Sequence, residues 1–134
     1  MIAMSDRHPD IQEFITIKSD LSKISGANLS VQFSKELQNA AINNEDWILC
    51  FPTDDQELIN ADVSKTPYNK LIDYGNGRYI KKVRASELFD LIIDMAWKNA
   101  EPGILLKSNI LEYDPSSVYD NLRYVVSNPL ILAA

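Results

Sequence analysis

Four groups of residues in this 134-residue chain have side chains suited to chemistry. Cys50 is the only thiol and His8 the only imidazole, so each is a candidate nucleophile or base. Asp54 and Asp55 are adjacent carboxylates, the type of pair that serves acid–base catalysis or metal binding. The segment Gly75-Asn76-Gly77 has the glycine content of a phosphate-binding loop.

Each of these groups also has a structural interpretation. Cys50 lies in the apolar run 47–51 with no cation beside it in sequence, which predicts a small buried hydrophobe. His8 precedes Pro9 at a helix start, and we expect it to serve that turn or solvent, because no catalytic partner is near it in sequence.

The carboxylates and the glycines are interpreted in the same way. Asp54 and Asp55 are expected in a solvated loop. The segment 75–77 is followed by a strand pattern, whereas a phosphate loop opens a helix, so we interpret it as a turn. Residue types and spacing alone therefore predict no active site.

Composition narrows the class of protein. With 13 basic and 19 acidic residues the net charge is −6, which disfavours nucleic-acid binding. One cysteine excludes an intrachain disulfide framework, and one cysteine with one histidine excludes the usual zinc ligand set. No apolar stretch nears the roughly 18 residues of a membrane span, and 1–10 does not resemble a signal peptide. We predict a cytoplasmic single domain, 1–134, with no nucleic-acid or membrane partner.

The elements that must position any site alternate between helix and strand. Apolar periodicity and capping residues predict helices at 9–18, 34–43, with Ser34 as its expected N-cap, and 87–99. They predict strands at 27–33, 47–51, 79–83, 104–106 and 122–126. Between them, 53–78 is a long loop excursion. The order indicates an α/β fold, an incomplete barrel or open mixed sheet of four to five strands with about three helices.

Two of these elements carry more specific expectations. The strand 27–33 alternates apolar and polar residues, which predicts half-burial with Asn28, Ser30 and Gln32 on one face. The helix 87–99, with Ser86 as its expected cap, is apolar nearly all round, so it needs cover on two sides and is expected to self-associate.

Several sequence blocks, taken in order, resemble one enzyme family. They are Asp-Arg-His-Pro-Asp-Ile-Gln-Glu-Phe-Ile at 6–15, Lys18, Gly-Ala-Asn-Leu-Ser-Val at 26–31, Ala-Trp-Lys-Asn-Ala-Glu-Pro-Gly-Ile-Leu at 96–105, and Ser-Asn-Pro at 127–129. Together they resemble the catalytic subunit of adenosylcobalamin-dependent (class II) ribonucleotide reductase over nearly the whole chain, with extra length around 53–78.

The resemblance implies a fold and a chemistry. The family has a ten-stranded α/β barrel and replaces the ribose 2′-hydroxyl by hydrogen, using a thiyl radical that cobalamin generates and electrons from a cysteine pair. Its Asn-Pro-Cys-Gly-Glu finger loop matches here only at Asn128, which would contact substrate, and Pro129. Leu130 stands at the radical cysteine, Ile131 at the glycine and Leu132 at the glutamate, so the chain alone is expected to be inactive and to need no cofactor.

Two hypotheses follow from this departure. The chain is a fragment from a truncated or interrupted reductase gene, with the remaining reductase segments as partners. Alternatively, it is a stand-alone, non-catalytic α/β binding or oligomerisation module that self-associates through 87–99.

Overall fold

A parallel sheet forms one half of the structure, a computed structural model that describes residues 1–20, 24 and 26–118. Its strands are β1 (Ile2–Ser5), β2 (Leu29–Phe33) and β6 (Gly103–Leu106), in the order β1-β2-β6. Met4 lies beside Val31 and Val31 beside Ile104, so the strands run in register. Because all three are parallel, their carboxyl ends meet at one edge of the sheet.

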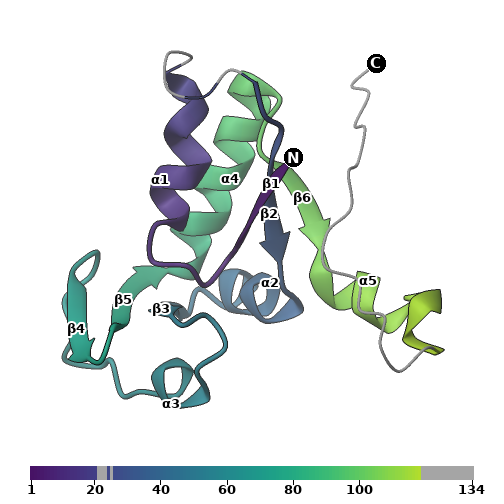
Figure 1. The fold of residues 1–134 in the computed structure, drawn as a ribbon. Helices are drawn as coiled ribbons and strands as arrows, with labels where there is room; N and C mark the ends of the chain where they lie inside the picture. The colour runs from purple at the N-terminus through teal and green to yellow at the C-terminus, as the bar shows by residue number, and fades with distance from the viewer. Residues whose placement is uncertain (21–23, 25, 119–134) are drawn as a thin grey trace.

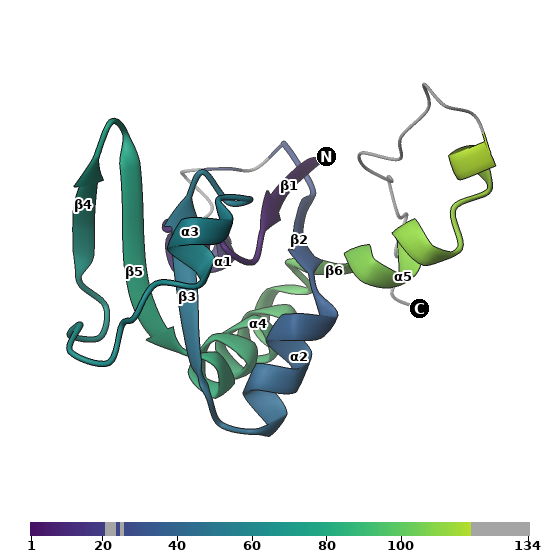
Figure 2. The same cartoon turned by 90° about the horizontal axis from the view of Figure 1, so that it is seen from below.

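A second sheet is antiparallel and lies apart from the first. It contains β3 (Asp46–Phe51), β5 (Arg78–Arg84) and β4 (Leu71–Gly75), in the order β3-β5-β4. Strands β4 and β5 form a hairpin whose tight turn places Asn76 and Gly77 at positive φ, 54° and 72°. Figure 2 shows this hairpin on the opposite side of the molecule from α5 (Lys107–Glu112).

The helices pack mainly on one side of the parallel sheet. Figure 1 shows α1 (Ile11–Thr16) beside α4 (Ala85–Asn99), with α2 (Lys35–Ile42) below them. The short helix α3 (Gln56–Ile59) packs on β3. Two single 3₁₀ turns, η1 (Ile17–Ser19) and η2 (Pro115–Val118), complete the described elements.

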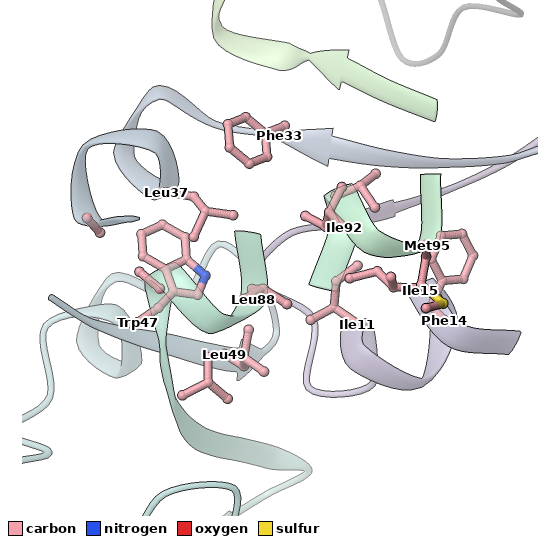
Figure 3. Packing of buried hydrophobic residues seen from close by; sticks show 14 of the residues in the cluster. Ile11, Phe14, Ile15, Phe33, Leu37, Trp47, Leu49, Leu88, Ile92 and Met95 are labelled. Carbon is pink, nitrogen blue, oxygen red and sulfur yellow. The ribbon is translucent and has the colours of Figure 1, made fainter. Parts of the chain in front are cut away.

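The core lies where these helices meet both sheets. Figure 3 shows side chains from α1, α2, α4, β2 and β3 converging on one cluster. Ile11, Leu37, Leu49 and Ile92 are completely buried there. The cluster is continuous, so the two sheets share one core.

The mixed α/β class is confirmed, but the architecture differs from the predicted single sheet. The described residues form five α-helices and two three-stranded sheets, and neither sheet closes into a barrel. The sequence prediction missed β1 and α5, and the excursion 53–78 contains α3 and most of the β4–β5 hairpin. The predicted strand 122–126 lies outside the described residues.

Two local predictions were wrong. Ser30 is 2% exposed rather than half-buried; its hydroxyl donates a hydrogen bond to Met1 Sδ at 3.6 Å, so the first residue of the chain lies against it. Ser86 does not cap α4, which begins one residue earlier at Ala85. Instead, the Ser86 hydroxyl donates a hydrogen bond to Asn44 Oδ1 at 2.9 Å.

The sequence predicts that the long helix needs cover on two sides, and the described residues cover only one of them. Helix α4 buries Leu88, Ile92 and Met95 against α1 and α2. Its opposite face stays open, with Trp97 90% exposed and Ile93 46% exposed. A helix apolar nearly all round therefore has only one of its apolar faces covered.

Candidate functional site

The carboxyl edge of the parallel sheet carries a cleft lined by several charged and hydroxyl side chains. Strands β1, β2 and β6 are followed there by Asp6, Ser34 and Lys107 respectively. These residues line a cleft of about 440 Å³, together with Arg7, Ser108 and Asp54. We call it the carboxyl-edge cleft. Ligands of open α/β sheets bind at the carboxyl ends of the strands, so this is the expected position for a site.

A larger hollow lies elsewhere and is the weaker candidate. It measures about 540 Å³ and is lined by apolar side chains of β2, α4 and β6 and by polar side chains of α2 and α5: Phe33, Phe89, Ile104, Leu106, Lys35, Gln38, Asn39 and Asn109. Its one charged side chain, Lys35, is held at 2.8 Å by Glu112. The hollow therefore offers few charged groups to a ligand, whereas the carboxyl-edge cleft brings together carboxylates, cations and hydroxyls.

Asp6 is the most constrained residue of the cleft. Its side chain is nearly inaccessible, and Oδ2 accepts hydrogen bonds from the Ser34 N–H at 2.8 Å and the Ser34 hydroxyl at 2.6 Å. Burial raises the pKa of the Asp6 carboxyl, although the Ser34 hydrogen bonds and the charges of Arg7 and Lys107 act in the opposite direction. A buried acid between two cations is able to hold a proton or to stay ionised, depending on what occupies the cleft.

The backbone of Asp6 contacts two further strands. Its N–H donates to the Gln32 carbonyl of β2 at 3.2 Å. Its carbonyl accepts from the Trp47 indole N–H of β3 at 3.0 Å. Asp6 thus connects the end of β1 to β2 of its own sheet and to β3 of the second sheet.

Arg7 lies against β3 beside this junction. Its guanidinium carbon sits 3.8 Å from the centre of the Trp47 ring, and Nη1 donates to the Ile48 carbonyl at 3.3 Å. Burial lowers the pKa of Arg7, with Asp6 acting against it, but an arginine remains charged at neutral pH. Ring stacking and the hydrogen bond therefore fix a permanent cation at the wall of the cleft.

The opposite wall comes from the N-terminus of α2 and from α5. The Ser34 hydroxyl caps α2 by accepting the Leu37 N–H at 3.2 Å, as its place before the apolar stripe predicted. The Lys35 N–H donates to the Ser108 hydroxyl at 3.2 Å, and the Lys35 amine pairs with Glu112. These contacts hold α5, and with it Lys107, beside the end of β2.

The residues singled out from sequence lie away from this arrangement, apart from Asp54. Cys50 is completely buried in β3, and burial raises the pKa of its thiol, so its interpretation as a core residue is confirmed. A cation does lie near Cys50 in the fold, although none lies beside it in sequence. The Cys50 N–H donates a hydrogen bond to the Arg7 carbonyl, and the charge of Arg7 acts on the thiol. Among the described residues, no group of three or more acidic, His or Cys side chains is arranged to hold a metal ion.

His8 and Asp55 have the structural roles of turn and cap. His8 Nδ1 accepts the Asp10 N–H at 3.1 Å, which confirms that the imidazole serves the turn before α1. Asp55 caps α3 and pairs with Arg78, so it is bound rather than free in a solvated loop. Gly75-Asn76-Gly77 forms the β4–β5 turn, as predicted.

Asn128, the residue that the resemblance placed in contact with substrate, lies outside the described residues, as does Leu130. Sequence reasoning missed Asp6 and Lys107 as site residues. The sequence signal for these two site residues was their position directly after a strand, but the strand β1 before Asp6 was not predicted.

None of the described helices combines the length and apolarity required to cross a bilayer.

Comparison with known proteins supplies the context for this geometry. The family described as "Ribonucleotide reductase, barrel domain" matches residues 1–129. A vitamin B12-dependent ribonucleoside-diphosphate reductase of Thermoplasma acidophilum is 32% identical over 109 residues. These residues are 81% of this chain but 11% of that protein, so the chain spans only a small part of its relative's length.

Proposed function

The chain belongs to the ribonucleotide reductase barrel-domain family, and we propose that it supplies three parallel strands and the carboxyl-edge cleft to the nucleotide site of a vitamin B12-dependent ribonucleotide reductase. The match over 1–129 is the observation that carries this proposal. The parent reaction replaces the ribose 2′-hydroxyl by hydrogen, which produces deoxyribonucleotides for DNA synthesis.

The chemistry of the cleft supports a nucleotide ligand. Arg7 and Lys107 supply positive charge for phosphate oxygens, beside the acids Glu36 and Asp54 of the same cleft. The Ser108 hydroxyl accepts the Lys35 N–H and keeps its own proton for a phosphate or sugar oxygen, whereas the Ser34 proton is donated to Asp6. The volume of about 440 Å³ lies within the range of roughly 300–1,000 Å³ for small-ligand sites. These groups bind and orient; no thiol lies in the described cleft, since Cys50 is buried elsewhere.

Adenosylcobalamin does not fit the described residues. A corrin ring with its nucleotide tail is much larger than any ligand that a cleft of about 440 Å³ encloses. We therefore assign the cofactor to other parts of the reductase and derive no step through it. The position that the family gives to the radical cysteine is Leu130, whose side chain has no S–H bond, so the chain by itself should not reduce nucleotides.

A segment exchange tests the proposal. Residues 1–129 would replace the matching segment of the Thermoplasma acidophilum reductase, and ribonucleoside diphosphate reduction would be measured with adenosylcobalamin and a dithiol. We expect measurable deoxyribonucleotide formation by the exchanged enzyme and none by a control that lacks the segment. A folded, cobalamin-binding exchange protein that makes no product would contradict the proposal.

A further inference from the structure

One buried carboxyl holds together the parts that form the carboxyl-edge cleft. The Asp6 side chain is 3% exposed and binds Ser34 twice through Oδ2. Ser34 in turn caps α2 through its hydroxyl oxygen. The end of β1 and the start of α2 are therefore joined by one carboxylate.

The backbone of the same residue fixes the carboxylate in place. The Asp6 N–H and carbonyl are bound by Gln32 and by Trp47, one from each sheet. The side chain thus projects from a backbone that is held on both sides. A group held this way transmits its position to whatever it binds, which here is Ser34 and the N-terminus of α2.

We propose that Asp6 is a positioning residue of the carboxyl-edge cleft: it fixes Ser34 against the end of β1 and so sets the distance between the hydroxyls of the cleft and the cations Arg7 and Lys107. This inference rests on the proposed function only for the identity of the ligand. Asp6 itself acts through Ser34 rather than through contact with substrate.

The charges around Asp6 make its role measurable. Arg7 and Lys107 both act on the Asp6 carboxyl, while Glu36 and Asp54 line the same cleft. Because Asp6 binds the Ser34 N–H directly, the amide signal of Ser34 should follow the titration of Asp6. A carboxylate that served only to fill space would leave that signal unchanged.

The first test follows the Asp6 carboxyl carbon and the Ser34 amide by NMR as a function of pH, in the whole 134-residue chain. We expect both signals to share one midpoint above the ordinary aspartate value, since burial raises the pKa of Asp6. Asp6→Asn should abolish the Ser34 transition. Asp10→Asn is the matched control, because Asp10 is 69% exposed at the start of α1 and should leave the transition intact. A Ser34 amide that does not titrate with Asp6 would overturn the proposal.

The second test measures the affinity of the chain for ADP. ADP is titrated into the wild-type chain and into Asp6→Ala, and the amide shifts of Ser34 and Ser108 are followed. We expect binding at least about tenfold weaker in the variant, the effect of losing roughly 1.4 kcal/mol of interaction. Equal affinity in a folded Asp6→Ala variant, which has no side-chain oxygen left to bind Ser34, overturns the positioning role. Absence of ADP binding to the wild-type chain contradicts the proposed function, while the pH titration still decides the role of Asp6.

A variant at Ser34 covers the case in which the Asp6 variants do not fold. Ser34→Ala removes the hydroxyl donor and keeps the backbone N–H that binds Asp6. The ionised carboxyl loses one hydrogen bond, so the midpoint of Asp6 should move upward. An unchanged midpoint would overturn the proposal.

Discussion

Asp55 illustrates how one carboxylate stabilises two elements at once. Oδ1 accepts the N–H groups of Glu57 and Leu58 at the start of α3, and Oδ2 accepts Arg78 Nε at 2.9 Å. Desolvation acts to raise the pKa of Asp55, but the hydrogen bonds from Leu58 and Arg78 outweigh it and lower the pKa. Asp55 therefore connects α3 to the β4–β5 hairpin.

This lowered pKa predicts the pH dependence of a variant. A carboxyl with a lower pKa in the folded state contributes stability above the unfolded value of about 3.9, and loses it as pH falls through the folded pKa. Asp55→Asn should therefore lower the free energy of unfolding at pH 7, and its deficit should shrink in acid. Urea unfolding of the wild-type chain and of Asp55→Asn, at pH 7 and in acid below the unfolded value, measures how the deficit in the free energy of unfolding changes. Asp54→Asn, at an exposed neighbour, is the control, and an Asp55→Asn deficit that does not change with pH would contradict the prediction.

At the residue scale, sequence predicted local roles better than long-range ones. The Ser34 cap and the turn role of His8 follow from neighbours in the chain, and both are present. The burial of Cys50 followed from its apolar run. Asp6 was not predicted, because its partners Ser34 and Trp47 lie 28 and 41 positions away and meet it only through the fold.

At the scale of elements, α4 shows which of its apolar residues hold the fold. Ile92 is completely buried and its neighbour Ile93 is 46% exposed. Ile92→Ala should lower the free energy of unfolding by about 2–5 kcal/mol through lost burial and a new cavity, and Ile93→Ala by less than about 1 kcal/mol. Chemical denaturation of both variants measures the difference. Equal losses would show that the outer face of α4 is also packed.

The β4–β5 turn gives a second element-scale prediction. Gly77 has a φ of +72°, which an L-residue adopts at a cost of about 1–2 kcal/mol. Gly77→Ala should therefore speed amide hydrogen exchange in β4 and β5. Gly26→Ala is the matched control, because a Cβ atom added at Gly26 would meet no non-neighbouring atom within 4 Å and its φ is not positive, so exchange should stay as in the wild-type chain. Unchanged hairpin protection in Gly77→Ala would contradict the prediction.

Element prediction succeeded where a segment is long and periodic. The bounds of α1, α2, α4, β3 and β5 match the predicted ranges to within a few residues. Strand β1 was missed because Ile2–Ser5 has only four residues, and its strand state depends on pairing with β2. Tertiary contacts of this kind are invisible in a local pattern.

At the scale of the whole molecule, the described structure has apolar surface that remains uncovered. Ile93 and Trp97 are one helical turn apart on the outer face of α4, so they form a neighbouring pair. In the described residues, β1 and β6 are the outer strands of the parallel sheet, and β4 is an outer strand of the second. Exposed apolar patches and unpaired strand edges both favour association.

The exposed apolar face of α4 predicts that the chain self-associates through this helix. Sedimentation of the wild-type chain should show a mass that rises with concentration across the micromolar range. Trp97→Gln should weaken that rise, because Trp97 is 90% exposed, against 46% for its neighbour Ile93. Tyr113→Gln is the control: Tyr113 is also exposed, at 76%, but it follows α5 and lies away from the α4 patch. A wild-type chain that stays monomeric would contradict the prediction, and an equal effect of both substitutions would show that exposed aromatic surface in general, rather than α4, drives association.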